Sequence, residues 1–202
     1  MGRGELSKAA ALFDELLRGS RDDLYYVIVM TNRARLYILQ GEQKSAQKIL
    51  HEAMLIYKKK EKMYIGVHAD ILLKKAHSFA LSGDLNKAEE FSSQAADVVS
   101  EIQRGFLVPI HAIIALRQAR MKSANRIFKE EWKLAEGSLD AGQMKHFRLL
   151  HAFALNSINA DTPAAETILL LQGLQQSYPG EYTYLGGNWP EMREFLARHQ
   201  LQ

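Results

Sequence analysis

Apolar residues recur along the chain at intervals of three, four and seven positions. Side chains at this spacing share one face of an α-helix. Prolines, which interrupt helices, occur only at Pro109, Pro163, Pro179 and Pro190, so long stretches of the chain are free to form long helices. The pattern predicts an all-α protein.

Three of the apolar runs open with the same short pattern, in which a glycine precedes an alanine by five residues. The pairs are Gly4 and Ala9, Gly41 and Ala46, and Gly83 and Ala88. Glycine can adopt the left-handed backbone conformation that ends a helix and turns the chain. Alanine in the next helix lets two helix axes approach closely. The second and third glycines are therefore expected to join two helices that pack against each other.

The helix before each of these two glycines carries a large, a small and an aromatic residue on one face. These residues are Met30, Ala34 and Tyr37 before Gly41, and Leu72, Ala76 and Phe79 before Gly83. The helix after each glycine carries two small residues, which are Ala46 and Ala53 in one copy and Ala88 and Ala95 in the other. Together these residues resemble the tetratricopeptide repeat family. The resemblance implies a right-handed superhelical solenoid of antiparallel helix hairpins.

Weaker copies of the pattern continue toward the C-terminus, with key alanines at positions 9, 46, 88, 124 and 165 and Ala119 in place of a turn glycine. We expect a helix over 5–18 and hairpins over about 22–60, 62–103, 106–137 and 141–177, which is about four and a half repeats in an array over 1–178. These repeats are longer than the family's short form of about 34 residues. In this they resemble the sensor arrays of bacterial regulators.

The last segment, 179–202, contains or adjoins an unusual group of aromatic residues: Tyr178, Tyr182, Tyr184 and Trp189. Exposed aromatic side chains could bind a partner. We favour the alternative that they fill the gap between the last repeat and a C-terminal capping helix, because the ends of helical arrays need caps. The stretch Asn188–Glu191 has the form of a capping box and predicts that this helix runs from about Pro190 to Arg198.

The first helix has no preceding partner in the repeat pattern, so the face that carries Leu12, Phe13 and Leu16 is expected to be half covered. One interpretation is that the chain is a piece of a longer protein. Another is that the uncapped end mediates homo-oligomer formation.

The resemblance also implies a binding groove lined by the first helix of each hairpin. The candidate groove residues are Ile28, Thr31, Asn32, Arg35, Asp70, Leu73, His77, Ile113 and Arg117. Asn32 and Arg35 match part of the basic clamp with which some members hold a peptide's C-terminal carboxylate. Asp70 and Pro109 depart from that clamp. We therefore expect a groove of mixed apolar and polar character that suits a peptide or a partner helix.

Signatures of catalysis are scarce. Gly186-Gly187 has neither a following lysine nor a preceding strand, so it does not form a phosphate-binding loop, and no Gly-x-Ser-x-Gly motif is present. None of the seven histidines forms a His-x-x-x-His pair. Adjacent carboxylates such as Glu89 and Glu90 diverge by about 100° on a helix. We predict that the protein is not an enzyme and binds neither a metal nor another cofactor.

The composition of the chain limits the cellular compartments and partners that we expect for the protein. Apolar residues make up 47% of the chain and charged residues 24%, which is typical of a globular protein, and there is no cysteine to form disulfides. The N-terminus lacks the apolar core of a signal peptide, and no window approaches the roughly 20 apolar residues of a membrane span. A net charge of +3 is too small to indicate nucleic acid binding. We predict a cytoplasmic protein that contacts neither membranes nor nucleic acids directly.

Two functions remain. The first is a protein–protein interaction module that binds a peptide or helix of a partner in the groove. The alternative is the ligand-sensing domain of a larger bacterial transcriptional regulator, in which the groove takes a small molecule or a signalling peptide. A continuous groove would favour the first function, and a deep pocket with a few convergent polar groups would favour the second.

Overall fold

The computed structural model describes residues 3–19, 23–59, 65–158, 161–177 and 180–202. This part of the chain contains helices and no strands, so the predicted all-α class is confirmed. The helices divide into two compact units, residues 1–99 and 100–202, which we describe separately.

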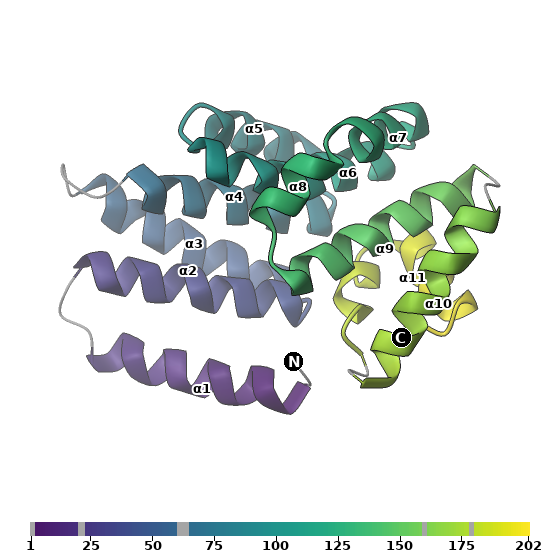
Figure 1. The fold of residues 1–202 in the computed structure, drawn as a ribbon. Helices are drawn as coiled ribbons and strands as arrows, with labels where there is room; N and C mark the ends of the chain where they lie inside the picture. The colour runs from purple at the N-terminus through teal and green to yellow at the C-terminus, as the bar shows by residue number, and fades with distance from the viewer. Residues whose placement is uncertain (1–2, 20–22, 60–64, 159–160, 178–179) are drawn as a thin grey trace. The chain divides into compact units, whose positions relative to one another are not determined.

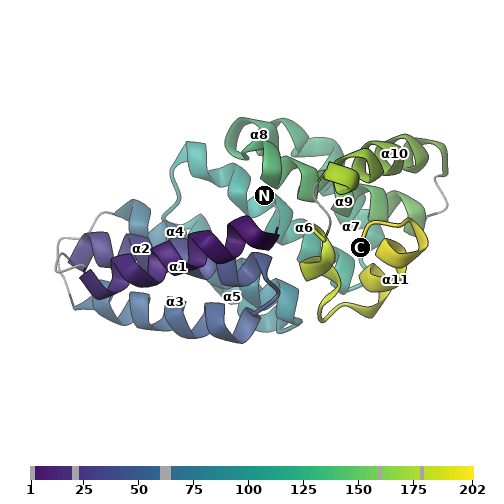
Figure 2. The ribbon, with the colours of Figure 1, turned by 90° about the horizontal axis from the view of Figure 1, so that it is seen from below.

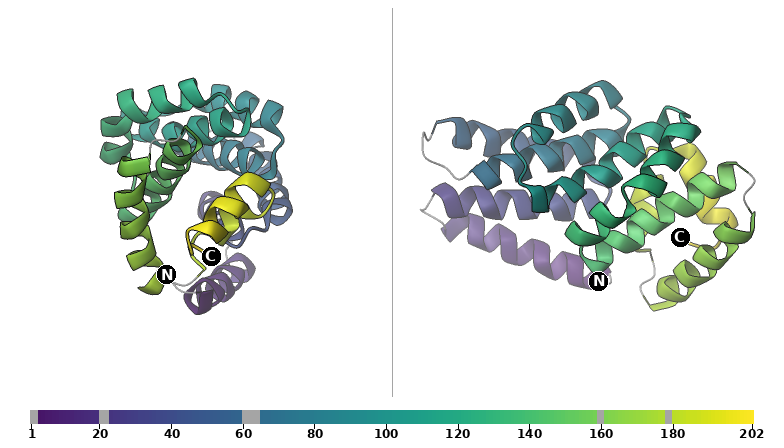
Figure 3. Two further views of the ribbon diagram at one scale, coloured as in Figure 1. Left: turned by 90° about the vertical axis from the view of Figure 1, so that its right-hand side faces the viewer. Right: turned by 45° about the horizontal axis from the view of Figure 1, so that its top comes forward.

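Among its described residues, the N-terminal unit contains five helices in sequence (Figures 1 and 3). They are α1 (Arg3–Gly19), α2 (Asp23–Leu39), α3 (Gln43–Lys58), α4 (Ile65–Ser82) and α5 (Leu85–Ala96). Each helix packs against the next one, and α2 also packs against α4. This last contact brings together the two helices that the repeat pattern marks as the first of their hairpins.

The small residues of the two clearest copies of the repeat pattern are buried at the contacts between helices, whereas the key alanines Ala9 and Ala165 of the weaker copies are half-buried and exposed, respectively. Six alanines have no exposed surface: Ala34, Ala46, Ala53, Ala76, Ala88 and Ala95. An alanine at such a site leaves room for the neighbouring helix, because it carries only a methyl group beyond the backbone.

Positive φ angles mark the turns between paired helices. Gly41 and Gly83 have φ angles of 80° and 92°, as the pattern predicted. Ala119, which stands where a glycine was expected, also has a positive φ of 54°. Around both Gly41 and Ala119 the chain makes the two backbone hydrogen bonds of a Schellman motif. The bond that spans five residues runs from Glu42 N to Tyr37 O (2.8 Å) at the first turn and from Arg120 N to Ala115 O (2.9 Å) at the second.

The α1–α2 contact contains a partly buried ion pair. The Arg33 side chain is only 9% exposed, and its Nε donates a hydrogen bond of 2.8 Å to Asp14 Oδ1. The guanidinium also lies over the Tyr37 ring, 4.0 Å from its centroid. On the other side of α1, Leu12 is 56% exposed, and Phe13 and Leu16 are half-buried, as the repeat pattern predicted for this face.

The C-terminal unit contains six α-helices and two short 3₁₀ helices among its described residues (Figure 1). They are η1 (Glu101–Phe106), α6 (Leu107–Arg117), α7 (Met121–Glu130), α8 (Trp132–Ser138), α9 (Ala141–Ser157), α10 (Asp161–Ser177), η2 (Thr183–Gly186) and α11 (Pro190–Arg198). The last helix has the bounds that the sequence predicted. The second helix of the third expected hairpin (106–137) is instead broken at Glu131 into α7 and α8.

The break places α8 against η1 at unusually close range. A Cβ atom added to Gly105 would lie 2.3 Å from the Leu134 carbonyl oxygen, which is far inside van der Waals contact. The Ser138 hydroxyl donates a hydrogen bond of 2.6 Å to the Ile102 carbonyl oxygen across the same contact. Gly105 is therefore required by close packing, a role that the repeat pattern did not reveal.

The segment that contains η2 and α11 lies beside α9 and α10 (Figure 2). Its aromatic residues Tyr182, Tyr184 and Trp189 are 0%, 6% and 3% exposed, which agrees with the gap-filling interpretation; Tyr178 lies outside the described residues. The predicted capping box does not form, since Trp189 is the N-cap residue of α11 and its side chain makes no capping hydrogen bond.

Candidate functional site

The first candidate site lies on the N-terminal unit, where α2 and α4 pack side by side. We call it the α2–α4 face and define it by the residues that are at least partly exposed there: Ile28, Asn32 and Arg35 of α2, and Asp70, Lys74 and His77 of α4. All of them except Lys74 are candidate groove residues from the sequence. Lys74 lies four residues after Asp70, so it shares a helix face with a predicted residue and could have been found from that spacing.

Electrostatic effects show that charged groups of the two helices lie close together. Asp70 and Lys74 form an ion pair along α4. Burial is the main cause that lowers the pKa of Lys74, and the Arg35 charge on α2 lowers it further, while Asp70 opposes both. Burial and the same Arg35 charge lower the pKa of His77 to about 4, so this imidazole is neutral at pH 7. At that pH the face carries two cations and one anion.

Three of the predicted groove residues are not accessible. Thr31 is 2% exposed, Leu73 6% and Ile113 1%. The Thr31 hydroxyl donates to the Ile28 carbonyl oxygen (2.9 Å), and the exposed Asn32 amide donates to the same oxygen (3.1 Å). The three buried side chains support the helices beneath the surface, so we exclude them from the candidate site.

Arg117, the last predicted groove residue, is engaged within the C-terminal unit. Its Nη2 donates a hydrogen bond of 2.7 Å to the Asn188 carbonyl oxygen, and its guanidinium lies 5.2 Å from the centroid of the Trp189 ring. Burial lowers its pKa, while the nearby Glu191 carboxylate opposes that shift. Arg117 therefore holds the C-terminal segment against α6.

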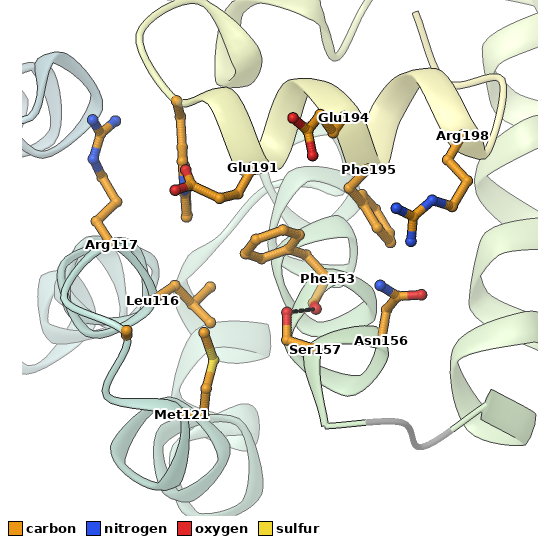
Figure 4. A pocket seen from close by; sticks show the side chains of 12 residues that line it. Leu116, Arg117, Met121, Phe153, Asn156, Ser157, Glu191, Glu194, Phe195 and Arg198 are labelled. Carbon is orange, nitrogen blue, oxygen red and sulfur yellow. Dashed lines mark hydrogen bonds between the residues drawn. The ribbon is translucent and has the colours of Figure 1, made fainter.

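The second candidate site is a pocket of about 280 Å³ in the C-terminal unit (Figure 4). Helices α6, α7, α9 and α11 and the residues just beside them form its walls. Its lining residues are Leu116, Arg117, Ala119, Met121, Phe153, Asn156, Ser157, Trp189, Glu191, Glu194, Phe195 and Arg198. Of these, only Arg117 was a candidate from the sequence.

The pocket combines an apolar interior with charged groups. Phe153 packs edge-to-face against both Trp189 and Phe195, with ring centroids 5.3 and 5.4 Å apart. Because all three rings are at least 95% buried, they form a fixed apolar wall. The charged side chains come mainly from α11, where Glu191, Glu194 and Arg198 succeed one another at intervals of three and four residues.

The described residues contain no group of three or more histidine, aspartate or glutamate side chains placed to hold a metal ion. In the same part of the chain, no helix has both the length and the apolar composition to cross a membrane. Comparisons with protein-family models, with curated proteins and with solved structures find no match for the chain.

Proposed function

We propose that the protein is a protein–protein interaction module, and that its helix hairpins stack as a right-handed superhelix of the tetratricopeptide type. The buried alanines, the left-handed turns at Gly41 and Gly83 and the α2–α4 contact support this proposal, because each is expected of such a stack. Stacked hairpins present rigid helix faces at regular spacing, which suits the capture of an extended or helical segment.

The α2–α4 face is the observation that carries the proposal. It combines the exposed Arg35 and the partly exposed Lys74 with Ile28, whose side chain is 38% exposed and can contact an apolar residue of a partner. The neutral His77 adds no charge at pH 7. The excess of positive charge favours a segment that carries carboxylates beside an apolar residue.

A selection from a displayed library of short random peptides tests this function. Peptides with an acidic residue near an apolar residue are expected to enrich on the wild-type protein and to lose binding to Arg35→Glu. Lys48→Glu on α3 is the matched control, because Lys48 is exposed outside the face and the substitution makes the same change in charge. Enriched peptides that bind Arg35→Glu as tightly as the wild type would refute the assignment of this face.

The pocket in the C-terminal unit favours a second candidate function, which is the ligand-sensing domain of a larger bacterial transcriptional regulator. Its apolar wall and its convergent polar groups are features of small-molecule sites. The substitution Ser157→Trp, at an exposed position of the wall, is expected to fill the pocket. A small molecule that raises the melting temperature of the wild type but not of Ser157→Trp would support this function, and equal stabilisation of both would place the ligand elsewhere.

A further inference from the structure

The pocket of the C-terminal unit is suited in size and shape to a small metabolite. Its volume of about 280 Å³ lies just below the roughly 300–1,000 Å³ that is typical of small-molecule sites. A nucleotide or a helix of a partner would be too large for it. The Phe153, Trp189 and Phe195 rings, with Leu116 and Met121, offer a contact surface for one apolar group.

Three polar side chains of the pocket have no partner among the described residues. The Asn156 amide, the Glu194 carboxylate and the Arg198 guanidinium line the pocket, yet none of them takes part in a hydrogen bond or an ion pair within that part of the chain. Figure 4 shows the Arg198 guanidinium and the Asn156 amide pointing toward each other, from α11 and α9. Glu194 lies four residues before Arg198 on α11, so the two share one side of that helix.

The two remaining charged residues of the pocket, Arg117 and Glu191, already interact with other groups of the protein. Arg117 is bonded to the Asn188 carbonyl oxygen, and the Glu191 carboxylate acts on Arg117. The groups available to a ligand are thus one cation, one anion and one amide. A ligand with both charges can satisfy all three, whereas a purely apolar ligand would remove them from water without compensation.

We propose that this pocket binds a free α-amino acid with a large apolar side chain, such as phenylalanine or leucine. The side chain lies against the three aromatic rings, the carboxylate accepts hydrogen bonds from Arg198 and Asn156, and the ammonium group donates to Glu194. This proposal rests on the second candidate function, and it is independent of the peptide-binding proposal for the α2–α4 face. A phosphate or a dicarboxylate is disfavoured, because Glu191 and Glu194 would repel its additional negative charge.

Isothermal titration of the full chain with L-phenylalanine and L-leucine tests the proposal. One site is expected, with a Kd on the order of 0.1–1 mM, as is usual for so small a ligand. Glu194→Gln and Arg198→Gln are each expected to weaken binding about tenfold or more, since each removes a charge-assisted hydrogen bond. Both residues are exposed, so the substitutions leave the fold intact. Glu166→Gln and Lys133→Gln are matched controls at exposed positions outside the pocket and should leave the Kd unchanged.

Three analogues determine which parts of the ligand are recognised. N-acetyl-L-phenylalanine lacks the ammonium group and represents the C-terminal residue of a peptide. L-phenylalaninamide lacks the carboxylate and represents an N-terminal residue, and benzyl alcohol lacks both charges. Weaker binding of all three than of free phenylalanine supports the proposal.

The outcomes against the proposal separate it from the function on which it rests. An analogue that binds as tightly as phenylalanine, and does not bind Ser157→Trp, would leave a small-molecule site in place but overturn its assignment to amino acids. If neither the amino acids nor the analogues bind at ligand concentrations of about ten times the expected Kd, both the assignment to amino acids and the sensing function lose their support.

Discussion

At the residue scale, the backbone conformation of single residues decides where helices end. Gly41 and Gly83 adopt positive φ angles without strain because they lack a Cβ atom. Ala119 adopts the same conformation with a Cβ atom, which costs about 1–2 kcal/mol. The fold therefore maintains this turn even where the sequence does not provide the best residue for it.

Replacing Ala119 by glycine should stabilise the protein. Relief of the left-handed strain exceeds the extra entropy that glycine gains in the unfolded chain, and the net gain is expected to be about 0.5–1 kcal/mol. Urea denaturation measures the change. Ala11→Gly is the control, because Ala11 is an exposed residue inside α1, where glycine should instead cost about 1 kcal/mol. A loss of stability in Ala119→Gly would contradict the strained turn.

His77 should make stability depend on pH. Its pKa is about 4 in the folded protein and near 6.5 in the unfolded chain, so the unfolded chain binds a proton at a higher pH than the folded protein does. His77 therefore leaves the unfolding free energy undiminished above pH 6.5 and lowers it progressively as the pH falls from 6.5 toward 4. His77→Gln should remove this part of the pH dependence of the unfolding free energy.

NMR titration of the imidazole carbon-bound protons of His77 measures the same property directly. The midpoint should lie near pH 4 in the wild type and should rise in Arg35→Gln, because Arg35 is one of the two causes of the shift. Arg18→Gln on α1 serves as the control and should leave the midpoint unchanged. A wild-type midpoint near 6.5 would show that His77 is solvated and far from Arg35.

At the element scale, contacts between helices explain features that helical periodicity does not. The expected third hairpin has a second helix that breaks at Glu131, so that the short helix α8 packs against η1. The contact is close enough for the Leu134 carbonyl oxygen to occupy the space of a Cβ atom on Gly105. Periodicity within one helix predicts its buried face, but it contains no information on the closest approach of two helices.

Gly105→Ala should destabilise the C-terminal unit strongly. The added methyl group would meet the Leu134 backbone oxygen, which cannot move without displacing α8, so a cost of about 2–4 kcal/mol is expected. Gly137→Ala in α8 is the control, because no atom lies within 4 Å of its Cβ position and alanine should stabilise the helix by about 0.5–1 kcal/mol. Thermal unfolding followed by circular dichroism compares the two. Equal melting temperatures would exclude the close α8–η1 contact.

At the scale of the whole molecule, each of the two compact units has its own buried core. In residues 1–99, the six buried alanines and the Phe79–Phe91 ring stack all lie within α2 to α5. In residues 100–202, the rings of Phe153, Trp189 and Phe195 form a corresponding centre. A unit whose core comes from its own helices can fold independently.

A fragment of residues 1–99 should therefore be helical and unfold cooperatively. Its helices supply their own core, and the loss of the other unit removes none of the contacts described within it. Circular dichroism during urea denaturation checks this expectation. A fragment of residues 1–82 is the matched control. It lacks α5 and so exposes Phe79, and it should unfold at lower urea concentration. A broad, non-cooperative transition in the longer fragment would contradict the division into two units.

The sequence by itself determined the helical class, the bounds of the last helix and the turns at Gly41 and Gly83. These features depend on local sterics and on the alternation of apolar and polar positions, which are both legible along the chain. It also pointed to Arg35 and His77 as candidate groove residues, because they lie on the helices that carry the clearest copies of the repeat pattern. It could not exclude Thr31, Leu73 and Ile113, whose burial depends on neighbouring helices.

Only the tertiary structure decided how the C-terminal segment is used. Arg117 bonds to a carbonyl oxygen 71 residues further along the chain, and this contact helps to build the pocket between α6, α9 and α11. Such a contact leaves no trace in periodicity or spacing, because it depends on the path of the chain through space. The pocket residues Asn156, Glu194 and Arg198 look like ordinary helix surface in the sequence, and they became a candidate site only when the fold placed them around one cavity.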